Sequence, residues 1–293
     1  MAITAALVKE LRERTQAGMM ECKKALVETN GDIDAAAEYM RKAGLAKADK
    51  KSGRTAAEGQ IVIKTSADSK VAVIIEINCE TDFVTKGDDF QKFAADVAET
   101  AIANQPDNID ALLSQSLASG STVADAAKAL IAKIGENINV RRYEKMAAAN
   151  GVVGSYLHGA RIGVITELDS DNVGLAKDLS MHIAASKPVC VNSDGVSADL
   201  ISKEKEIYTA QAAESGKPAE IVEKMVTGRI AKFLKEITLV GQPYVKDPDT
   251  TVEKLLKQNN ANVLGFHRFE VGEGIEKKQE NFAEEVMAQV KGS

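Results

Sequence analysis

The chain has 293 residues, of which 44% are apolar, so it is long enough for about two domains with real cores, and its composition argues against global disorder. A formal net charge of −6 opposes non-specific binding to nucleic acid or to anionic membranes. No apolar run approaches the roughly 20 residues of a transmembrane helix. The N-terminus also lacks the basic and apolar segments of a secretory signal.

The cysteines Cys22, Cys79 and Cys190 are few, odd in number and far apart in the sequence. This usage argues against a disulfide framework and predicts a reducing compartment, so we expect a cytoplasmic protein. No pair has the spacing of zinc ligands, and we expect Cys79 to be a buried filler residue.

A small helical bundle is predicted at the N-terminus. Thr4 can cap a helix over Ala5–Arg14, a second helix should cover Met19–Thr29, and Asp32 can cap a third that runs to Arg41 and ends at Gly44. Residues 46–58 are polar and basic, which predicts a linker or a frayed helix. A nucleic-acid patch is the alternative for this segment, but no aromatic residue lies among its basic ones.

An internal repeat follows the bundle. Residues 59–77 and 151–168 each predict a hairpin, and their second strands superpose, with Glu76 matching Glu167 and Ile77 matching Leu168. A helix should follow each hairpin, over Asp89–Asn104 and over Val173–Ala185. The repeat predicts a duplicated α+β core with antiparallel sheets.

The loop between strand and helix is longer in the first copy, and it carries Thr81, Asp82, Phe83 and Val84. Phe83 at the tip of such a loop either packs into its own core or projects into a partner. Because the neighbouring residues are acidic and polar, and because the loop is an addition to a repeated scaffold, we favour projection.

The remaining elements complete an α+β protein. Helices are expected over 107–118 and 122–134, and the last part of 134–142 alternates apolar and polar residues, which suggests an outer strand. A helical hairpin over 197–235 should protrude as an antiparallel coiled coil, or form an ordinary packed pair. A strand over Gly265–Val271 and a terminal helix over Gln279–Val290 follow. The expected coiled-coil seam consists of Leu200, Ile201, Ile207 and Ala210 against Ile221, Met225, Ile230 and Phe233.

Little in the sequence predicts catalysis. His158, His182 and His267 are the candidates for proton transfer near neutral pH, and none lies near another histidine or a cysteine in the sequence. Phosphate-binding and nucleophile motifs are absent from the sequence. Glu76 and Glu167 are better explained as symmetric structural residues than as a catalytic pair. We therefore expect no catalytic residues, no metal site and no cofactor.

Several motifs, taken in order, resemble the bacterial elongation factor Ts family over nearly the whole chain. They are Leu11–Thr15, Gly18–Leu26, Asn78–Val84, Ile134–Ile138, His158–Gly163, Ala184–Pro188, Gly241–Pro243 and Phe269–Ile275. The family is a guanine-nucleotide exchange factor for the GTPase elongation factor Tu, in its GDP-bound and nucleotide-free states. The resemblance implies a ubiquitin-associated-like N-terminal domain, a duplicated core, a protruding coiled coil and a C-terminal helical module.

The same resemblance assigns partner contacts. It implies that Arg12, Met19 and Met20 meet the GTPase domain, that Asp82 and Phe83 enter it beside Mg²⁺, and that the region of His158 touches another domain of the partner. Adjacent residues on a helix cannot face one core, so we expect one of Met19 and Met20 to pack inward.

The expected domains are 1–55, 56–145, 146–275 with the hairpin 197–235 inserted, and 276–293. We expect no direct contact with nucleic acid or membrane, while self-association stays open. Two other functions were weighed against nucleotide exchange. One is an interaction scaffold without exchange activity, and the other is an enzyme that uses His158 with a carboxylate.

Overall fold

The computed structural model describes residues 3–15, 17–214 and 218–276, so the terminal helix expected over Gln279–Val290 lies outside the described residues. The chain begins with a helical bundle in which Leu11, Cys22 and Leu26 form a small apolar core. Asp32 accepts a hydrogen bond from the amide of Ala35 and caps the third helix. The helices are α1 (Ala5–Thr15), α2 (Met19–Glu28) and α3 (Ile33–Lys51).

Helix α3 runs beyond Gly44, where the sequence predicted its end. Of the two alternatives for 46–58, helix holds up to Lys51. Residues 46–51 consist of Ala, Lys and Asp, mostly good helix formers. Gly44 does not end the helix. A Cβ on Gly44 would lie 3.0 Å from the Cβ of Ala132 in α6 (Val123–Ile134), so this glycine permits close packing of two helices.

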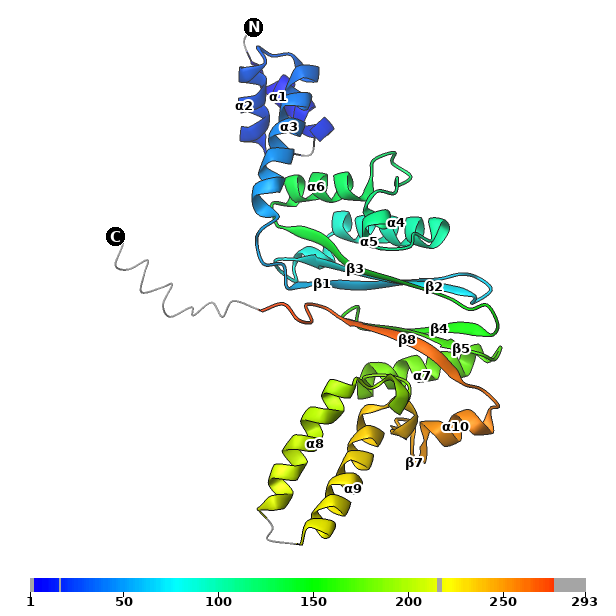
Figure 1. Cartoon of the computed structure of the whole chain (residues 1–293). Helices are drawn as coiled ribbons and strands as arrows, with labels where there is room; N and C mark the ends of the chain where they lie inside the picture. The colour runs from blue at the N-terminus through cyan, green and yellow to red at the C-terminus, as the bar shows by residue number, and fades with distance from the viewer. Residues whose placement is uncertain (1–2, 16, 215–217, 277–293) are drawn as a thin grey trace.

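The first sheet has the strand order β1 (Glu58–Thr65), β2 (Val71–Cys79) and β3 (Ile138–Ala147), all antiparallel. Its outer face is covered by α6, α4 (Asp88–Asn104) and the short α5 (Ile109–Leu113) (Figure 1). Strand β2 is buried on both faces. This double burial explains why its sequence is a continuous apolar run.

The second sheet repeats the first. Its order is β4 (Val152–His158), β5 (Ile162–Leu168) and β8 (Val263–Glu270), and α7 (Val173–Ser186) packs on its outer face. The register shifts between Glu76 and Ile77 in one sheet and between Glu167 and Leu168 in the other. These positions are the ones that the internal repeat superposes, so the duplication is confirmed down to a shared irregularity.

The two sheets lie face to face, with helices outside each (Figure 1). Ile61, Ile74, Ile165 and Phe269 belong to the apolar cluster between them. A Cβ on Gly163 would lie 2.5 Å from Cγ2 of Ile61, so glycine is required for the sheets to approach this closely. The core is therefore an α/β/β/α stack in which the chain after β2 and the turn after β4 have fixed relative positions.

Some expected elements differ in extent. The helix expected over 107–118 is reduced to Ile109–Leu113, because serine and glycine residues after it favour turns over helix. The outer strand expected in the last part of 134–142 begins at Ile138, after Gly135 ends α6 with φ +92°, and it continues to Ala147. The sequence reading missed β6 (Pro243–Tyr244), β7 (Asp247–Thr251) and α10 (Val252–Gln258), and it missed the short 3-10 helices over Ser193–Gly195 and Leu239–Gly241.

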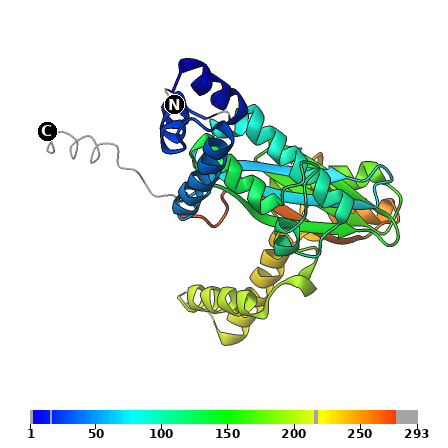
Figure 2. The same ribbon diagram turned by 90° about the horizontal axis from the view of Figure 1, so that it is seen from above.

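Helices α8 (Ala198–Ala213) and α9 (Ala219–Ile237) project from the core as an antiparallel pair (Figure 2). The expected seam is partly wrong, because Ile207 and Ile221 are exposed. The inner face of the pair instead includes the buried residues Ala212 and Val226. The guanidinium of Arg229 in α9 lies over the ring of Tyr208 in α8, 5.8 Å from its centroid.

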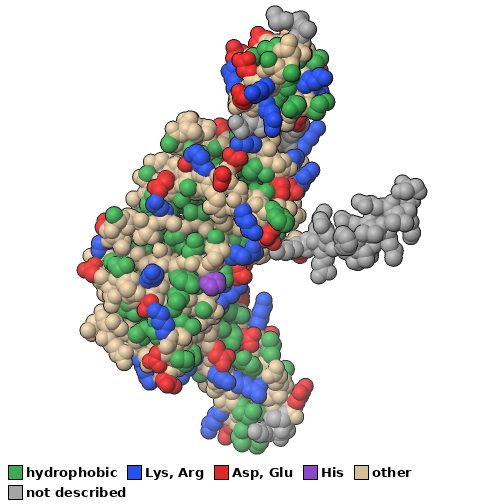
Figure 3. Space-filling view, turned by 180° about the vertical axis from the view of Figure 1, so that it is seen from behind, with side chains coloured by type: hydrophobic (Ala, Val, Ile, Leu, Met, Phe, Trp, Pro, Cys, Tyr) green, Lys and Arg blue, Asp and Glu red, His purple; other side chains and the backbone are tan. Residues whose placement is uncertain are grey.

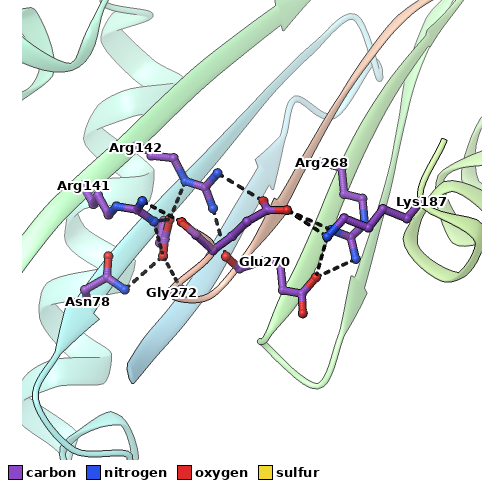
Figure 4. A network of polar contacts seen from close by, with 9 residues as sticks. Asn78, Arg141, Arg142, Lys187, Arg268, Glu270 and Gly272 are labelled. Carbon is purple, nitrogen blue, oxygen red and sulfur yellow. Dashed lines mark hydrogen bonds and ion pairs between the residues drawn. The ribbon is translucent and has the colours of Figure 1, made fainter. Parts of the chain in front are cut away.

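A buried ion network ties the two sheets together (Figure 4). The carboxylate of Glu76 is fully buried, pairs with Arg141 and Arg142 of β3, and accepts a hydrogen bond from the Gly272 amide at 2.8 Å. Arg142 also donates to the Glu270 carbonyl at 2.9 Å. Because the segment after β8 is thereby attached to β2 and β3, the network holds the two halves in register. Glu167 has no such surroundings; it is half-buried, and burial raises its pKa.

Replacing Glu76 by Ala should destabilise the protein by about 3–5 kcal/mol, because the mostly buried Arg141 and Arg142 would lose the carboxylate that both of them pair with. Urea unfolding of the full chain measures this loss. Glu144→Ala is the matched control, since Glu144 is an exposed carboxylate on β3 and should change stability by no more than about 0.5 kcal/mol. Equal effects of both variants would contradict a structural role for the network.

His182 is buried in α7, as expected for a structural histidine. Its Nε2 lies 3.0 Å from Oε1 of Gln242, and its Nδ1 accepts a hydrogen bond from the Val245 amide at 3.2 Å. Both contacts fit the neutral imidazole with its proton on Nε2. Burial lowers the pKa of His182, although the hydrogen bond to Gln242 opposes this effect.

Acidification should therefore weaken the fold through His182. The unfolded chain takes up this proton near pH 6.5 and the folded chain only at lower pH, so stability is complete above about pH 6.5 and falls below it. The free energy of unfolding should fall by at most about 1.4 kcal/mol per pH unit through this one group. Urea unfolding at pH 7.5 and 5.5 should show a smaller loss for His182→Gln than for the unsubstituted chain; equal losses would refute this assignment.

Candidate functional site: an anchored loop and its surroundings

The loop from Glu80 to Gly87 joins β2 to α4 and contains a short 3-10 helix over Val84–Lys86. The side chain of Phe83 is 78% exposed. Of the two positions considered for this ring, burial in its own core is therefore excluded. Val84, the next residue, is half-buried and packs on the core between the first sheet and its helices, so the exposure of the loop changes between two adjacent apolar residues.

Hydrogen bonds fix the loop on both sides of Phe83. Before it, the amide and hydroxyl of Thr81 donate to the two carboxylate oxygens of Glu136, at 2.9 and 2.7 Å. After it, the Thr85 hydroxyl donates to the Asp82 carbonyl at 2.6 Å, and the Gln91 side chain donates to the Thr85 carbonyl. The exposed ring is thus carried on an ordered backbone.

Several carboxylates lie around Cys79 at the base of the loop. The pKa of Cys79 is raised to about 12 by burial first, and then by the carboxylates of Glu136, Glu58, Asp82 and Glu80. Its thiol therefore stays protonated at neutral pH and donates to the Thr81 carbonyl at 3.0 Å. This confirms Cys79 as a buried structural residue, and a protonated thiol is a poor nucleophile.

The N-terminal candidates lie on the surface of the helical bundle. Arg12 is exposed on α1. Met19 and Met20, at the start of α2, are 60% and 74% exposed, so the expectation that one of them packs inward is wrong. Cys22 and Leu26 supply the core contacts of this helix instead, and both methionines are available as adaptable apolar contacts.

A cavity of about 750 Å³ lies between the bundle and α6. Met20 and Lys133 are both part of its wall, and Lys133 is ion-paired at 2.8 Å with Asp89, at the start of α4 just after the Phe83 loop. The surface that carries Met20 is therefore joined to the loop through α6. The wall consists of Thr15, Ala17, Gly18, Met20, Glu21, Lys24, Tyr39, Met40, Arg41, Ala43, Gly44, Ala129, Ala132 and Lys133.

His158 is exposed at the end of β4, and its Nδ1 lies 3.1 Å from the Tyr156 hydroxyl. Its partner is thus a phenol rather than the carboxylate that the enzyme hypothesis required. Arg161, in the same turn, pairs with Glu58 at 2.8 Å, and Glu58 lies opposite Cys79 in the sheet. The turn of His158 is therefore at the end of the stacked sheets from which the Phe83 loop emerges.

Other kinds of site find no support in the geometry. In the part of the chain that the structure describes, no group of three His, Cys, Asp or Glu residues is arranged to hold a metal ion. Each helix within that part is too short or too polar to cross a bilayer. The space-filling view in Figure 3 shows basic and acidic side chains interspersed over one face rather than gathered into a basic patch.

The sequence reading did not identify Glu136 as a functional residue. Glu136 lies within Ile134–Ile138, one of the motifs that resemble the family, and this was the only hint of a role in the sequence. The sequence does not show which group a carboxylate in a turn will bind. Only the fold brings residue 136 to residue 81.

Comparison with known proteins agrees with these observations. The family model described as elongation factor TS matches residues 80–273. Proteins named elongation factor Ts are 64% identical in Methylococcus capsulatus and 62% identical in Thioalkalivibrio sulfidiphilus, each over the full length of both chains. The one from Legionella pneumophila strain Paris is 60% identical over 99% of both chains. The chain therefore belongs to the elongation factor Ts family.

Proposed function

We propose that this protein is a guanine-nucleotide exchange factor that binds the GTPase elongation factor Tu and promotes release of GDP during translation elongation. The observation that carries the proposal is the Phe83 ring, which is 78% exposed on a loop anchored at both ends. Family membership supplies the partner, and the proposed place of action is the bacterial cytoplasm.

The mechanism follows from how a GTPase holds its nucleotide. The partner binds GDP through Mg²⁺ and a backbone cradle around the phosphates. In the proposal, Phe83 inserts between side chains of the G domain, Asp82 fixes the loop by hydrogen bonding, and the elements that position Mg²⁺ shift. Thr81 and Val84 support the inserted pair. Burying one phenylalanine supplies about 1.5–3 kcal/mol, so other contacts must supply the rest.

Those contacts come from the surfaces that the fold joins to the loop. We assign Arg12, Met19 and Met20 to the GTPase domain and His158 to a second domain of the partner. The coupling is reciprocal: whatever the factor does to weaken GDP, GDP does to weaken the factor. Incoming nucleotide can therefore expel the factor, so the partner is bound both with GDP and without nucleotide.

In the proposal, each expected domain contacts a particular part of the partner. Residues 1–55 and the loop of 56–145 engage the G domain, and 146–275 engages the second partner domain; the C-terminal module expected over 276–293 lies almost wholly outside the described residues. The protein itself would transform no substrate, so the proposal describes an exchange factor rather than an enzyme.

The scaffold hypothesis makes a different prediction. A scaffold would bind elongation factor Tu without accelerating GDP loss, whereas an exchange factor accelerates it at substoichiometric amounts. Stopped-flow release of fluorescent GDP from elongation factor Tu, with and without this protein, separates the two. If GDP leaves elongation factor Tu no faster with this protein than without it, the proposed function is refuted.

Replacing Phe83 by Ala should leave the fold intact, because the ring has few contacts of its own, and should slow stimulated GDP release about tenfold, equivalent to about 1.4 kcal/mol. The stopped-flow assay measures the rate, and thermal unfolding checks the fold. Leu264→Ala is the control, since Leu264 is an exposed apolar residue on β8 at the opposite end of the sheet. Release as fast as with the unsubstituted chain would remove Phe83 from the mechanism.

Met19→Ala and Met20→Ala should each change the stability by less than about 0.5 kcal/mol, because both side chains are exposed. Each should weaken binding to nucleotide-free elongation factor Tu by about 1 kcal/mol, or roughly fivefold. Titration calorimetry and melting curves measure the two effects separately. Val27→Ala, at an exposed position on the same helix, should change neither the stability nor the affinity. If Met19→Ala and Met20→Ala lower the stability but not the affinity, the assignment is contradicted.

A further inference from the structure

The turn between α6 and β3, residues 135–137, contacts the Phe83 loop through two carboxylates. Glu136 accepts hydrogen bonds from the Thr81 amide at 2.9 Å and from the Thr81 hydroxyl at 2.7 Å, one on each carboxylate oxygen. In return, the neighbouring Glu80 accepts a hydrogen bond from the Asn137 amide at 2.6 Å. Charge-assisted bonds of this kind are about twice as strong as neutral ones. The start of the loop is therefore clamped to the turn.

The same turn also holds the chain that leaves the N-terminal bundle. The buried side chain of Asn137 donates to the carbonyls of Ser52 and Arg54, at 3.2 and 2.7 Å. Lys51, at the end of α3, donates to the Gly135 carbonyl at 2.5 Å. One turn thus connects the loop to the end of α3, the last helix of the bundle that carries Met19 and Met20.

The position of Glu136 suits a role in function better than one in core stability. Its carboxylate is only partly buried, and both donors belong to Thr81, an exposed residue of the loop. The apolar clusters of the core contain neither residue. Removing the carboxylate would therefore free the Thr81 amide and hydroxyl and loosen the loop just before Phe83, while the bonds from Asn137 to Glu80 and from Cys79 to the Thr81 carbonyl stay in place and the packed interior is unchanged.

We propose that Glu136 is a positioning residue for nucleotide exchange: by clamping Thr81, it sets the direction in which Phe83 leaves the surface. This role rests on the proposed function. Glu136 does not itself enter the partner. It acts through Thr81, since a ring that must fit between foreign side chains needs a backbone whose orientation is set before contact.

The test measures the maximal rate of GDP release from elongation factor Tu at saturating concentrations of the full-length factor. Glu136→Ala should lower this rate about fivefold, with a smaller change in the half-saturating concentration. The same substitution added to Phe83→Ala should lower the rate less than twofold further, because there is no ring left to position. Glu144→Ala, an exposed carboxylate on the following strand, should leave the rate unchanged.

Three outcomes would overturn the positioning role. They are an unchanged rate with Glu136→Ala, a fivefold loss that persists in the Phe83→Ala background, and a loss that Glu144→Ala reproduces. If Glu136→Ala melts below the assay temperature, Glu136→Gln, which keeps one acceptor oxygen, takes its place in the same comparison and should give a loss of about twofold to threefold. If the unsubstituted chain does not accelerate GDP release, the proposed function itself is refuted. If the unsubstituted chain accelerates release and Phe83→Ala slows it while Glu136→Ala does not, only the positioning role is refuted.

Discussion

An exposed aromatic ring on a fixed backbone is the constraint on which the account of this protein depends. Exposing the apolar ring of Phe83 to water is unfavourable. If the loop were flexible, the ring could fold back onto the surface of the protein. The hydrogen bonds of Thr81 and Thr85 prevent this by fixing the backbone on both sides. The apolar surface is therefore kept available for another molecule, and the cost of ordering the loop is met when the protein folds rather than when it binds.

The rest of the fold serves to place this loop among other exposed groups. Two duplicated sheets stack face to face, and the buried carboxylate of Glu76 ties the segment after β8 to β2 and β3. The loop after β2 and the turn of His158 consequently emerge at one end of the stack. The turn at Gly135–Asn137 connects the helical bundle to the same place. A duplicated scaffold has in this way acquired an asymmetric surface.

Sequence reasoning succeeded where a residue's neighbours lie close in the chain or where one period dominates. The duplicated hairpins, α4 and α7 followed from their apolar patterns, and the insertion of Phe83 followed from comparing the two copies. It failed where distant contacts decide the outcome. Gly44 continues a helix because Ala132 lies against it, both methionines are exposed because other residues fill the small core, and Glu136 acquires its role only when the sheet brings it to Thr81. The domain limits and partner contacts stay predictions.

The most direct measurement follows the aromatic position itself. The chain has no tryptophan, so a Phe83→Trp variant labelled with 5-fluorotryptophan has a single fluorine, and unlabelled elongation factor Tu contributes none. The account predicts a fluorine resonance typical of an exposed indole in the free factor, and a shift with loss of solvent accessibility when nucleotide-free elongation factor Tu is added. An unchanged, solvent-accessible resonance in a complex that demonstrably forms would contradict it.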